Sequence, residues 1–153
     1  MEVTKRTFCS PLLMQSRRVL VLSDLHQQPK DDYLPLWCSL QPDLVWIVGD
    51  FLESGDHGSR MKQDTLALLR ALADRFPIYY SLGNHECGAL GNKRPRGIGA
   101  TSMPVTATQQ RMIDDLATTG VQVLHNEWIQ LEDICLGGLT SAADGWLPFD
   151  FLE

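Results

Sequence analysis

The chain reads VLVLSDLH at residues 19–26, LVWIVGD at residues 44–50 and IYYSLGNHE at residues 78–86. Each stretch opens on a mainly apolar run and closes on polar residues. Continuous apolar runs of this length are typical of strands buried on both faces of a sheet. We therefore expect three buried strands, each followed at its carboxyl end by a polar loop.

The segments between and after these strands have helical spacing. Residues 65–76 and 108–119 place their apolar side chains on one helical face, and Gly120 is a typical helix stop. A shorter helix is expected at residues 34–40, where Pro35 suits only the first turn. Strands that alternate with helices predict βαβ units and a largely parallel sheet, so the expected fold class is α/β.

The remaining segments predict one long loop and a second group of strands. Residues 87–105 are rich in glycine and proline, which predicts a loop. Residues 121–124, 128–131 and 134–136 predict strands, the last two joined as a hairpin at Glu132 and Asp133. A chain of 153 residues that is 44% hydrophobic can build one core, so we expect a single domain over residues 1–153.

Charge and composition restrict the classes of partner. Thirteen Lys and Arg residues against nineteen Asp and Glu residues give a net charge of −6, which does not favour a nucleic-acid backbone or an anionic membrane for the chain as a whole. The apolar run Pro11–Met14 is too short for a signal-peptide core or a membrane span. The four cysteines form no C-x-x-C pair. We expect a cytoplasmic protein, and the oligomeric state stays open.

The sequence lacks the signature motifs of several enzyme classes. The chain has no G-x-x-x-x-G-K-[ST] loop and no G-x-G-x-x-G turn after a strand, so nucleotide-fuelled and dinucleotide chemistry have no support. It also has no G-x-S-x-G elbow of the kind used by serine hydrolases. The function must therefore be sought at the three strand ends.

Polar residues that close the three strands are oxygen and nitrogen donors: Asp24, His26, Asp50, Asn84, His85 and Glu86. The carboxyl ends of parallel strands form the crevice where α/β sheets bind ligands, so three separate loops would converge there. Such donors suit Mn²⁺, Zn²⁺, Fe or Mg²⁺. The glycines before Asp50 and Asn84 would let the backbone turn sharply and approach a bound group closely.

The ordered pattern D-x-H, G-D and G-N-H-[D/E], each part at the end of an apolar strand, resembles the calcineurin-like metallophosphoesterase superfamily. Asp24 and Asp50 are 26 residues apart and Asp50 and Asn84 are 34 apart, which leaves room for a crossover helix each time. The resemblance is clear over residues 18–86 and continues through residues 110–138, where it is similar to the small phosphohydrolase branch. It implies a β-sandwich flanked by helices and a phosphate-ester substrate.

The resemblance also implies roles for individual residues. Asp24 and His26 would hold one divalent metal ion, Asp50 would bridge two, and Asn84 would bind the second ion and touch the substrate phosphate. The metal could be Mn, Fe, Zn or Mg. The pair of ions would activate a bound water as hydroxide for hydrolysis of a phosphomonoester or a phosphodiester.

Three further residues are implied near the substrate. His85 would lie beside the phosphate without binding metal, and would stabilise the transition-state charge or protonate the leaving oxygen. Glu86 would orient a ligand or a backbone donor, with helix-start electrostatics as the alternative. Arg94, in the basic part of the 87–105 loop, would contact phosphate, with a solvated basic loop as the alternative.

One part of the superfamily pattern has no counterpart. The pattern adds three later histidines, one isolated and two in G-H-x-H, whereas this chain has none after His125. We therefore expect a partial domain, truncated at its C-terminal end. Two hypotheses stay open, namely a metal-dependent phosphoesterase and a non-catalytic metal-binding fragment.

Overall fold

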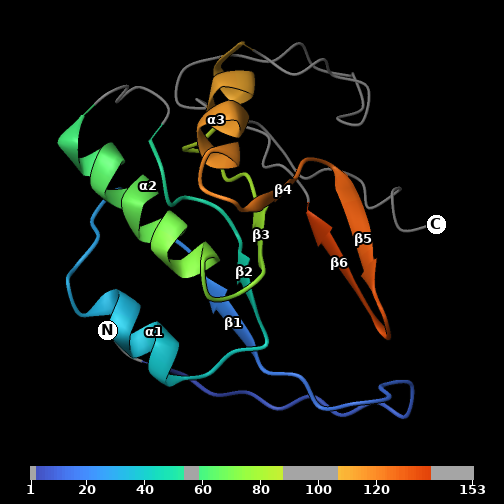
Figure 1. Ribbon diagram of the computed structural model, residues 1–153. Coiled ribbons are helices and arrows are strands. Elements are labelled where there is room, and N and C mark those ends of the chain that lie inside the picture. The colour runs from blue at the N-terminus through green and yellow to red at the C-terminus, as the bar shows by residue number, and fades with distance from the viewer. Residues whose placement is uncertain (1–2, 54–58, 88–106, 139–153) are drawn as a thin grey trace.

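A computed structural model describes residues 3–53, 59–87 and 107–138 (Figure 1). The elements are β1 (Val19–Leu22), α1 (Tyr33–Ser39), β2 (Leu44–Ile47), α2 (Arg60–Ala73), β3 (Ile78–Ser81), α3 (Ala107–Ala117), β4 (Gln122–Leu124), β5 (Glu127–Leu131) and β6 (Ile134–Gly138). Every strand and helix expected from the sequence is present, so the α/β class is confirmed. The loop expected at residues 87–105 lies outside the described residues, apart from Cys87.

The main sheet has four parallel strands in the order β1-β2-β3-β4. Val19 pairs with Leu44, and Tyr79 of β3 pairs with both Trp46 and Gln122. All four carboxyl ends therefore point to the same edge, as predicted. Strands β5 and β6 form a separate antiparallel hairpin whose turn contains Glu132 with a positive φ of 53°.

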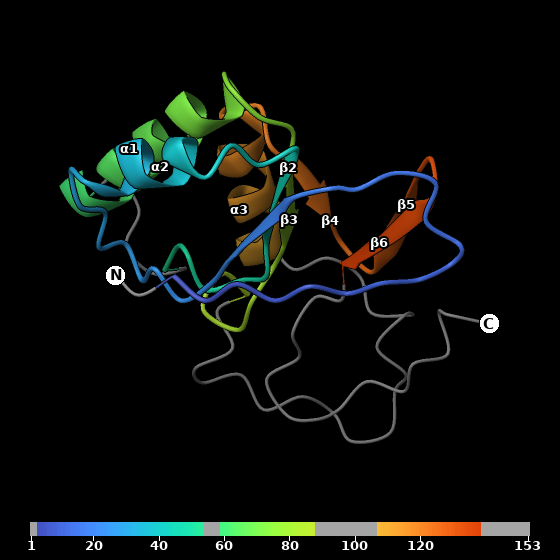
Figure 2. The ribbon, with the colours of Figure 1, turned by 90° about the horizontal axis from the view of Figure 1, so that it is seen from below.

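Two apolar layers enclose the main sheet, with the helices on one side and the β5–β6 hairpin on the other (Figure 2). On the helical side, Trp37, Leu69 and Met112 pack against the sheet residues Ile47 and Tyr80. The second layer joins β2, β4 and the hairpin through Leu44, Leu124 and Leu136, with Trp46 and Ile129 beside them. This arrangement is a small β-sandwich flanked by helices. The carboxyl edge of the main sheet belongs to the layer that the helices and the hairpin enclose.

Helix α2 begins at Arg60, whereas the apolar spacing had predicted a start at Thr65. Ser59 has an extended backbone (φ −62°, ψ 154°), and its hydroxyl accepts the Lys62 N–H at 3.1 Å, which is an N-cap. The first turn carries mainly polar residues, so hydrophobic periodicity could not reveal it. Lys62 is buried, and its ammonium lies 2.5 Å from an Asp115 oxygen of α3, so this first turn joins the two helices.

None of the helices in the described ranges has the length and apolar character required to cross a membrane.

Removing the α2 cap tests this earlier start. Ser59→Ala should lower the free energy of unfolding by about 1 kcal/mol, because the Lys62 N–H loses its acceptor. Urea denaturation measures the change, and Ser16→Ala, at an exposed serine outside any helix, is the matched control. Equal stability of the two variants would show that the helix does not depend on this cap.

Candidate metal centre

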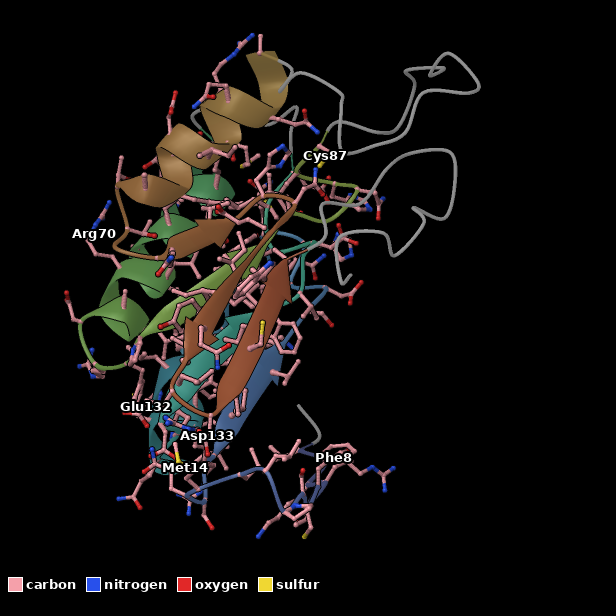
Figure 3. The ribbon with its side chains drawn as sticks, turned by 90° about the vertical axis from the view of Figure 1, so that its right-hand side faces the viewer. Phe8, Met14, Arg70, Cys87, Glu132 and Asp133 are labelled. Atoms are coloured by element: carbon pink, nitrogen blue, oxygen red, sulfur yellow. The ribbon has the colours of Figure 1, made fainter. Side chains whose placement is uncertain are left out.

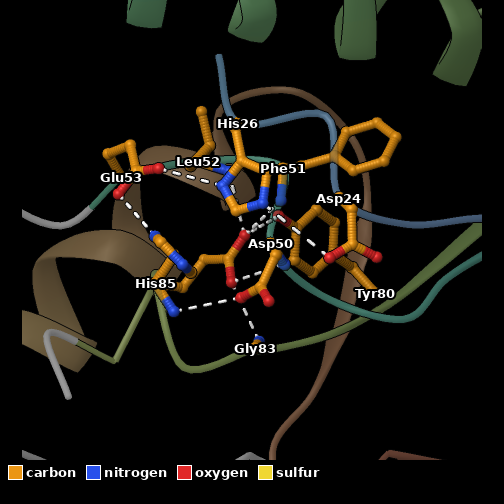
Figure 4. A network of polar contacts seen from close by, with 10 residues as sticks. Asp24, His26, Asp50, Phe51, Leu52, Glu53, Tyr80, Gly83 and His85 are labelled. Carbon is orange, nitrogen blue, oxygen red and sulfur yellow. Dashed lines mark hydrogen bonds and ion pairs between the residues drawn. The ribbon is translucent and has the colours of Figure 1, made fainter. Parts of the chain in front are cut away.

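The loops that follow β1, β2 and β3 meet at the carboxyl edge of the sheet (Figure 4). The first two loops stay paired beyond their strands, since the Asp24 N–H donates to the Gly49 carbonyl at 3.2 Å and the His26 N–H to the Asp50 carbonyl at 2.9 Å. The third loop joins them where the His85 N–H donates to Asp50 Oδ1 at 3.0 Å. Hydrogen bonds donated by backbone N–H groups therefore fix the relative positions of residues that are up to 61 positions apart in sequence.

Three of the predicted metal ligands have a left-handed backbone. Their φ angles are +56° at Asp24, +49° at His26 and +59° at Asp50. Non-glycine residues in such sparsely populated regions cost about 1–3 kcal/mol each, and they persist only where the surroundings over-determine them. Clusters of this kind occur preferentially at functional sites. The strain here is held by the loop-to-loop hydrogen bonds described above.

Gly49 and Gly83 bring two of the loops into direct backbone contact. A Cβ added to Gly49, whose φ is +92°, would lie 2.6 Å from the Gly83 Cα, and a Cβ on Gly83 would lie 2.1 Å from Asp50 Oδ1. The sequence had suggested close approach to a bound group as the reason for these glycines. The structure shows that the close approach is between the loops themselves.

The carboxylate of Glu86 is the anchor of this arrangement. The residue is fully buried. Its two oxygens accept four backbone N–H groups, from Asp50 (2.9 Å), Phe51 (2.7 Å), Leu52 (2.9 Å) and Gly83 (2.9 Å). They also accept the Tyr80 hydroxyl at 2.5 Å. Five donors converge on a group that can only accept, so the ionised carboxylate is the form that satisfies them.

Three side chains above this anchor could share a metal ion. His26, Asp50 and His85 present ligand atoms that all lie within 4.8 Å of one another. Asp24 Oδ1 lies 3.8 Å from His26 Nε2, which adds a second carboxylate to the group. The His26 and His85 rings meet edge to face, with centroids 4.4 Å apart. Carboxylate oxygens and imidazole nitrogens in this arrangement fit a divalent transition metal.

Glu53 connects the two imidazoles. His26 Nδ1 lies 3.0 Å from one of its carboxylate oxygens and His85 Nδ1 lies 2.7 Å from the other (Figure 4). A carboxylate that accepts the Nδ1–H of a histidine sets its tautomer and leaves Nε2 as the available ligand or proton-transfer atom. Glu53 therefore orients both rings toward the same space.

A family model described as calcineurin-like phosphoesterase matches residues 17–148, a range that includes every described helix and strand. The chain belongs to this family. A search of curated proteins found no match. The resemblance noted from the D-x-H, G-D and G-N-H-E pattern is thereby confirmed, and phosphoesterase chemistry is the activity that the family indicates.

Most of the residues singled out in this calcineurin-like phosphoesterase lie at one place. The structure brings Asp24, His26, Asp50 and His85 together. Asn84 is partly exposed and lies between Gly83 and His85 in the third loop. Arg94 lies outside the described residues.

Sequence reasoning missed Glu53. Asp50 and Glu53 lie in the same loop, so the carboxylate three positions after the G-D motif was an available signal. The residue carried no motif of its own. Its role depends on two histidines that follow different strands and come together only in the folded phosphoesterase.

The hydrogen bond between Glu53 and His85 shifts the pKa values of these two residues. The hydrogen bond to Glu53 raises the pKa of His85 above its usual value, although burial opposes the shift. Burial alone would raise the pKa of Glu53, and the hydrogen bonds from His85 and His26 outweigh it and lower that pKa. Glu53 therefore favours a cationic His85 in the metal-free protein.

Replacing the buried anchor should destabilise the whole fold. Glu86→Gln turns an amide NH₂ toward backbone donors, and we expect a loss of about 3 kcal/mol or more, typical of breaking a buried charged network. Thermal and urea unfolding measure the change. Glu127→Gln, at an exposed position of β5, is the matched control. A Glu86→Gln protein as stable as this control would contradict the anchoring role.

Replacing Glu53 should lower the pKa of His85. In metal-free protein, NMR titration of the imidazole should give a pKa above 6.5 for His85 in the parent and a lower pKa in Glu53→Gln. The lowered pKa of Glu53 stabilises the fold fully above pH 4.5, and the raised pKa of His85 stabilises it fully below pH 6.5. The difference in the free energy of unfolding between the parent and Glu53→Gln should therefore be largest between these two pH values. An unchanged His85 titration in Glu53→Gln would exclude the interaction.

Proposed function

We propose that this chain hydrolyses phosphate esters with two divalent metal ions held at the carboxyl edge of its parallel sheet. The observation that carries the proposal is that Asp24, His26 and Asp50 come together, with His85 beside them, in a member of the calcineurin-like phosphoesterase family. Phosphomonoesters and phosphodiesters are both proposed substrates.

The proposed ligands divide between the two ions. Asp24 and His26, whose Oδ1 and Nε2 atoms lie 3.8 Å apart, would hold the first ion. Asp50, whose Oδ1 accepts the His85 N–H, would serve both ions. Asn84 would offer its amide oxygen to the second ion and an N–H to the phosphate. Bound divalent ions would neutralise the phosphate charge and activate a water molecule for attack on phosphorus.

His85 has two chemically distinct roles available, as a metal ligand or as a cation beside the phosphate. Glu53 contacts Nδ1 of both His26 and His85, so this contact does not separate the two roles. We assign His85 to the substrate side, as the resemblance to the superfamily implies, where the Nε2–H would stabilise the developing negative charge or pass a proton to the leaving oxygen. Glu53 positions this ring through Nδ1.

Metal-dependent hydrolysis is the direct test. Metal-stripped protein should hydrolyse p-nitrophenyl phosphate or bis-p-nitrophenyl phosphate when Mn²⁺ is added back. Asp50→Asn should lower the rate by about 10²-fold or more, because a charged contact to the metal centre is lost. Asp74→Asn, at an exposed aspartate just after α2, is the matched control and should leave the rate unchanged. Mn²⁺ binding measured by calorimetry gives a readout that is independent of activity.

A His85→Gln variant separates the two roles of this histidine. If His85 acts on the substrate, the variant should bind Mn²⁺ as the parent does and hydrolyse about 10²–10⁴-fold more slowly. Weakened Mn²⁺ binding would instead make His85 a ligand. A folded parent protein that binds metal and cleaves neither ester would support the non-catalytic metal-binding hypothesis and overturn our proposal.

A further inference from the structure

The N-terminal segment carries an exposed apolar group. Nine large hydrophobic side chains are exposed in the described part of the chain, and five of them lie between residues 3 and 14: Val3, Phe8, Leu12, Leu13 and Met14. Phe8, Leu12 and Met14 are 86%, 81% and 78% exposed. Single exposed apolar residues are ordinary, whereas several of them within one short segment suit a site of protein or membrane interaction.

Part of this segment is held in a defined conformation. The Leu13 N–H donates to the Ser10 carbonyl at 3.2 Å, which closes a turn with Leu12 at its tip. Asp133, in the β5–β6 turn, accepts the Met14 N–H at 2.6 Å and Arg17 Nε at 3.2 Å. The turn is thus attached to the hairpin, so presenting Leu12 and Met14 to a partner requires little additional ordering.

The same segment has a local charge opposite to that of the protein. Residues 3–14 contain two basic residues and no acidic residue, whereas the whole chain has a net charge of −6. Arg17 is neutralised by Glu132 and Asp133. Lys5 and Arg6 are exposed and lie directly before Phe8 in the sequence. The exposed cations therefore lie beside Phe8, whereas Arg17 and its two carboxylate partners lie beside Met14.

We propose that residues 3–14 dock this protein on the surface of an anionic lipid bilayer. Phe8, Leu12 and Met14 would enter the boundary between headgroups and acyl chains, while Lys5 and Arg6 would contact lipid phosphates. A second copy of the chain is the less suitable occupant, because pairing this segment with itself would bring the cations of the two copies together.

The location of the segment determines the orientation of the docked protein. Phe8 and Met14 lie at one end of the molecule and Cys87, which follows His85 and Glu86, lies at the other (Figure 3). A protein attached through residues 3–14 would therefore hold the candidate metal centre away from the bilayer. The docking proposal rests on the N-terminal segment alone and does not depend on phosphoesterase activity.

Vesicle co-sedimentation of the full chain tests the proposal. Vesicles of phosphatidylcholine with phosphatidylglycerol should bind the protein about tenfold or more tightly than vesicles of phosphatidylcholine alone. Raising the salt from about 0.1 M to about 0.5 M should weaken this binding. The triple variant Phe8→Ser, Leu12→Ser and Met14→Ser should reduce binding about tenfold or more, and Lys5→Gln with Arg6→Gln should remove the preference for the anionic lipid.

The matched control is Met61→Ser with Trp128→Ser, which removes two exposed apolar side chains elsewhere (49% and 56% exposed) and should leave vesicle binding unchanged. Thermal unfolding of every variant verifies that it is folded. Parent binding that the triple variant retains, or that the control loses equally, would overturn the proposal. Absence of binding to anionic vesicles would also overturn it, and self-association abolished by the triple variant would identify a second copy as the occupant instead.

Discussion

The buried carboxylate of Glu86 is the interaction on which the arrangement of the site depends. It gathers the backbone N–H groups of the loop after β2 and of Gly83, and it accepts the Tyr80 hydroxyl. The loop after β1 is in turn paired with the loop after β2. One ionised group therefore positions three loops, and its burial is tolerated because every donor around it is directed at its oxygens. The nearby hydroxyl is affected as well, since burial and then the Glu86 charge raise the pKa of Tyr80 well above its usual value.

Above this anchor, three further carboxylates concentrate negative charge. Asp24, Asp50 and Glu53 lie around two imidazoles, and the left-handed backbone at Asp24 and Asp50 fixes where two of these carboxylates project. A cation bound at such a place relieves carboxylate repulsion and supplies the positive charge that a phosphate group requires. An overall net charge of −6 is therefore compatible with an anionic substrate. The exposed cations Lys5 and Arg6 belong to the N-terminal segment.

The fold could largely be predicted from the sequence, because the patterns that specify its strands and helices are local. Buried parallel strands require uninterrupted apolar runs, and the helices that cover them require apolar spacing on one face, so residues 19–22, 44–47 and 78–81 could be assigned from composition alone. The early start of α2 could not, because its first turn depends on a Ser59 cap and on a buried ion pair between Lys62 and Asp115. That pair joins two helices whose contact the sequence does not encode locally.

The sequence by itself determined the type of chemistry, since oxygen and nitrogen donors follow three buried strands and parallel strands bring their carboxyl ends to one edge. Which donors come within ligand distance was decided by tertiary structure. Glu53 bridges His26 and His85, and Gly49 contacts Gly83, through approaches between loops that are distant in sequence. The physical reason is that motifs report local backbone preference, whereas a hydrogen bond or a steric contact depends on the position of both partners, and only packing of the complete sheet sets that position.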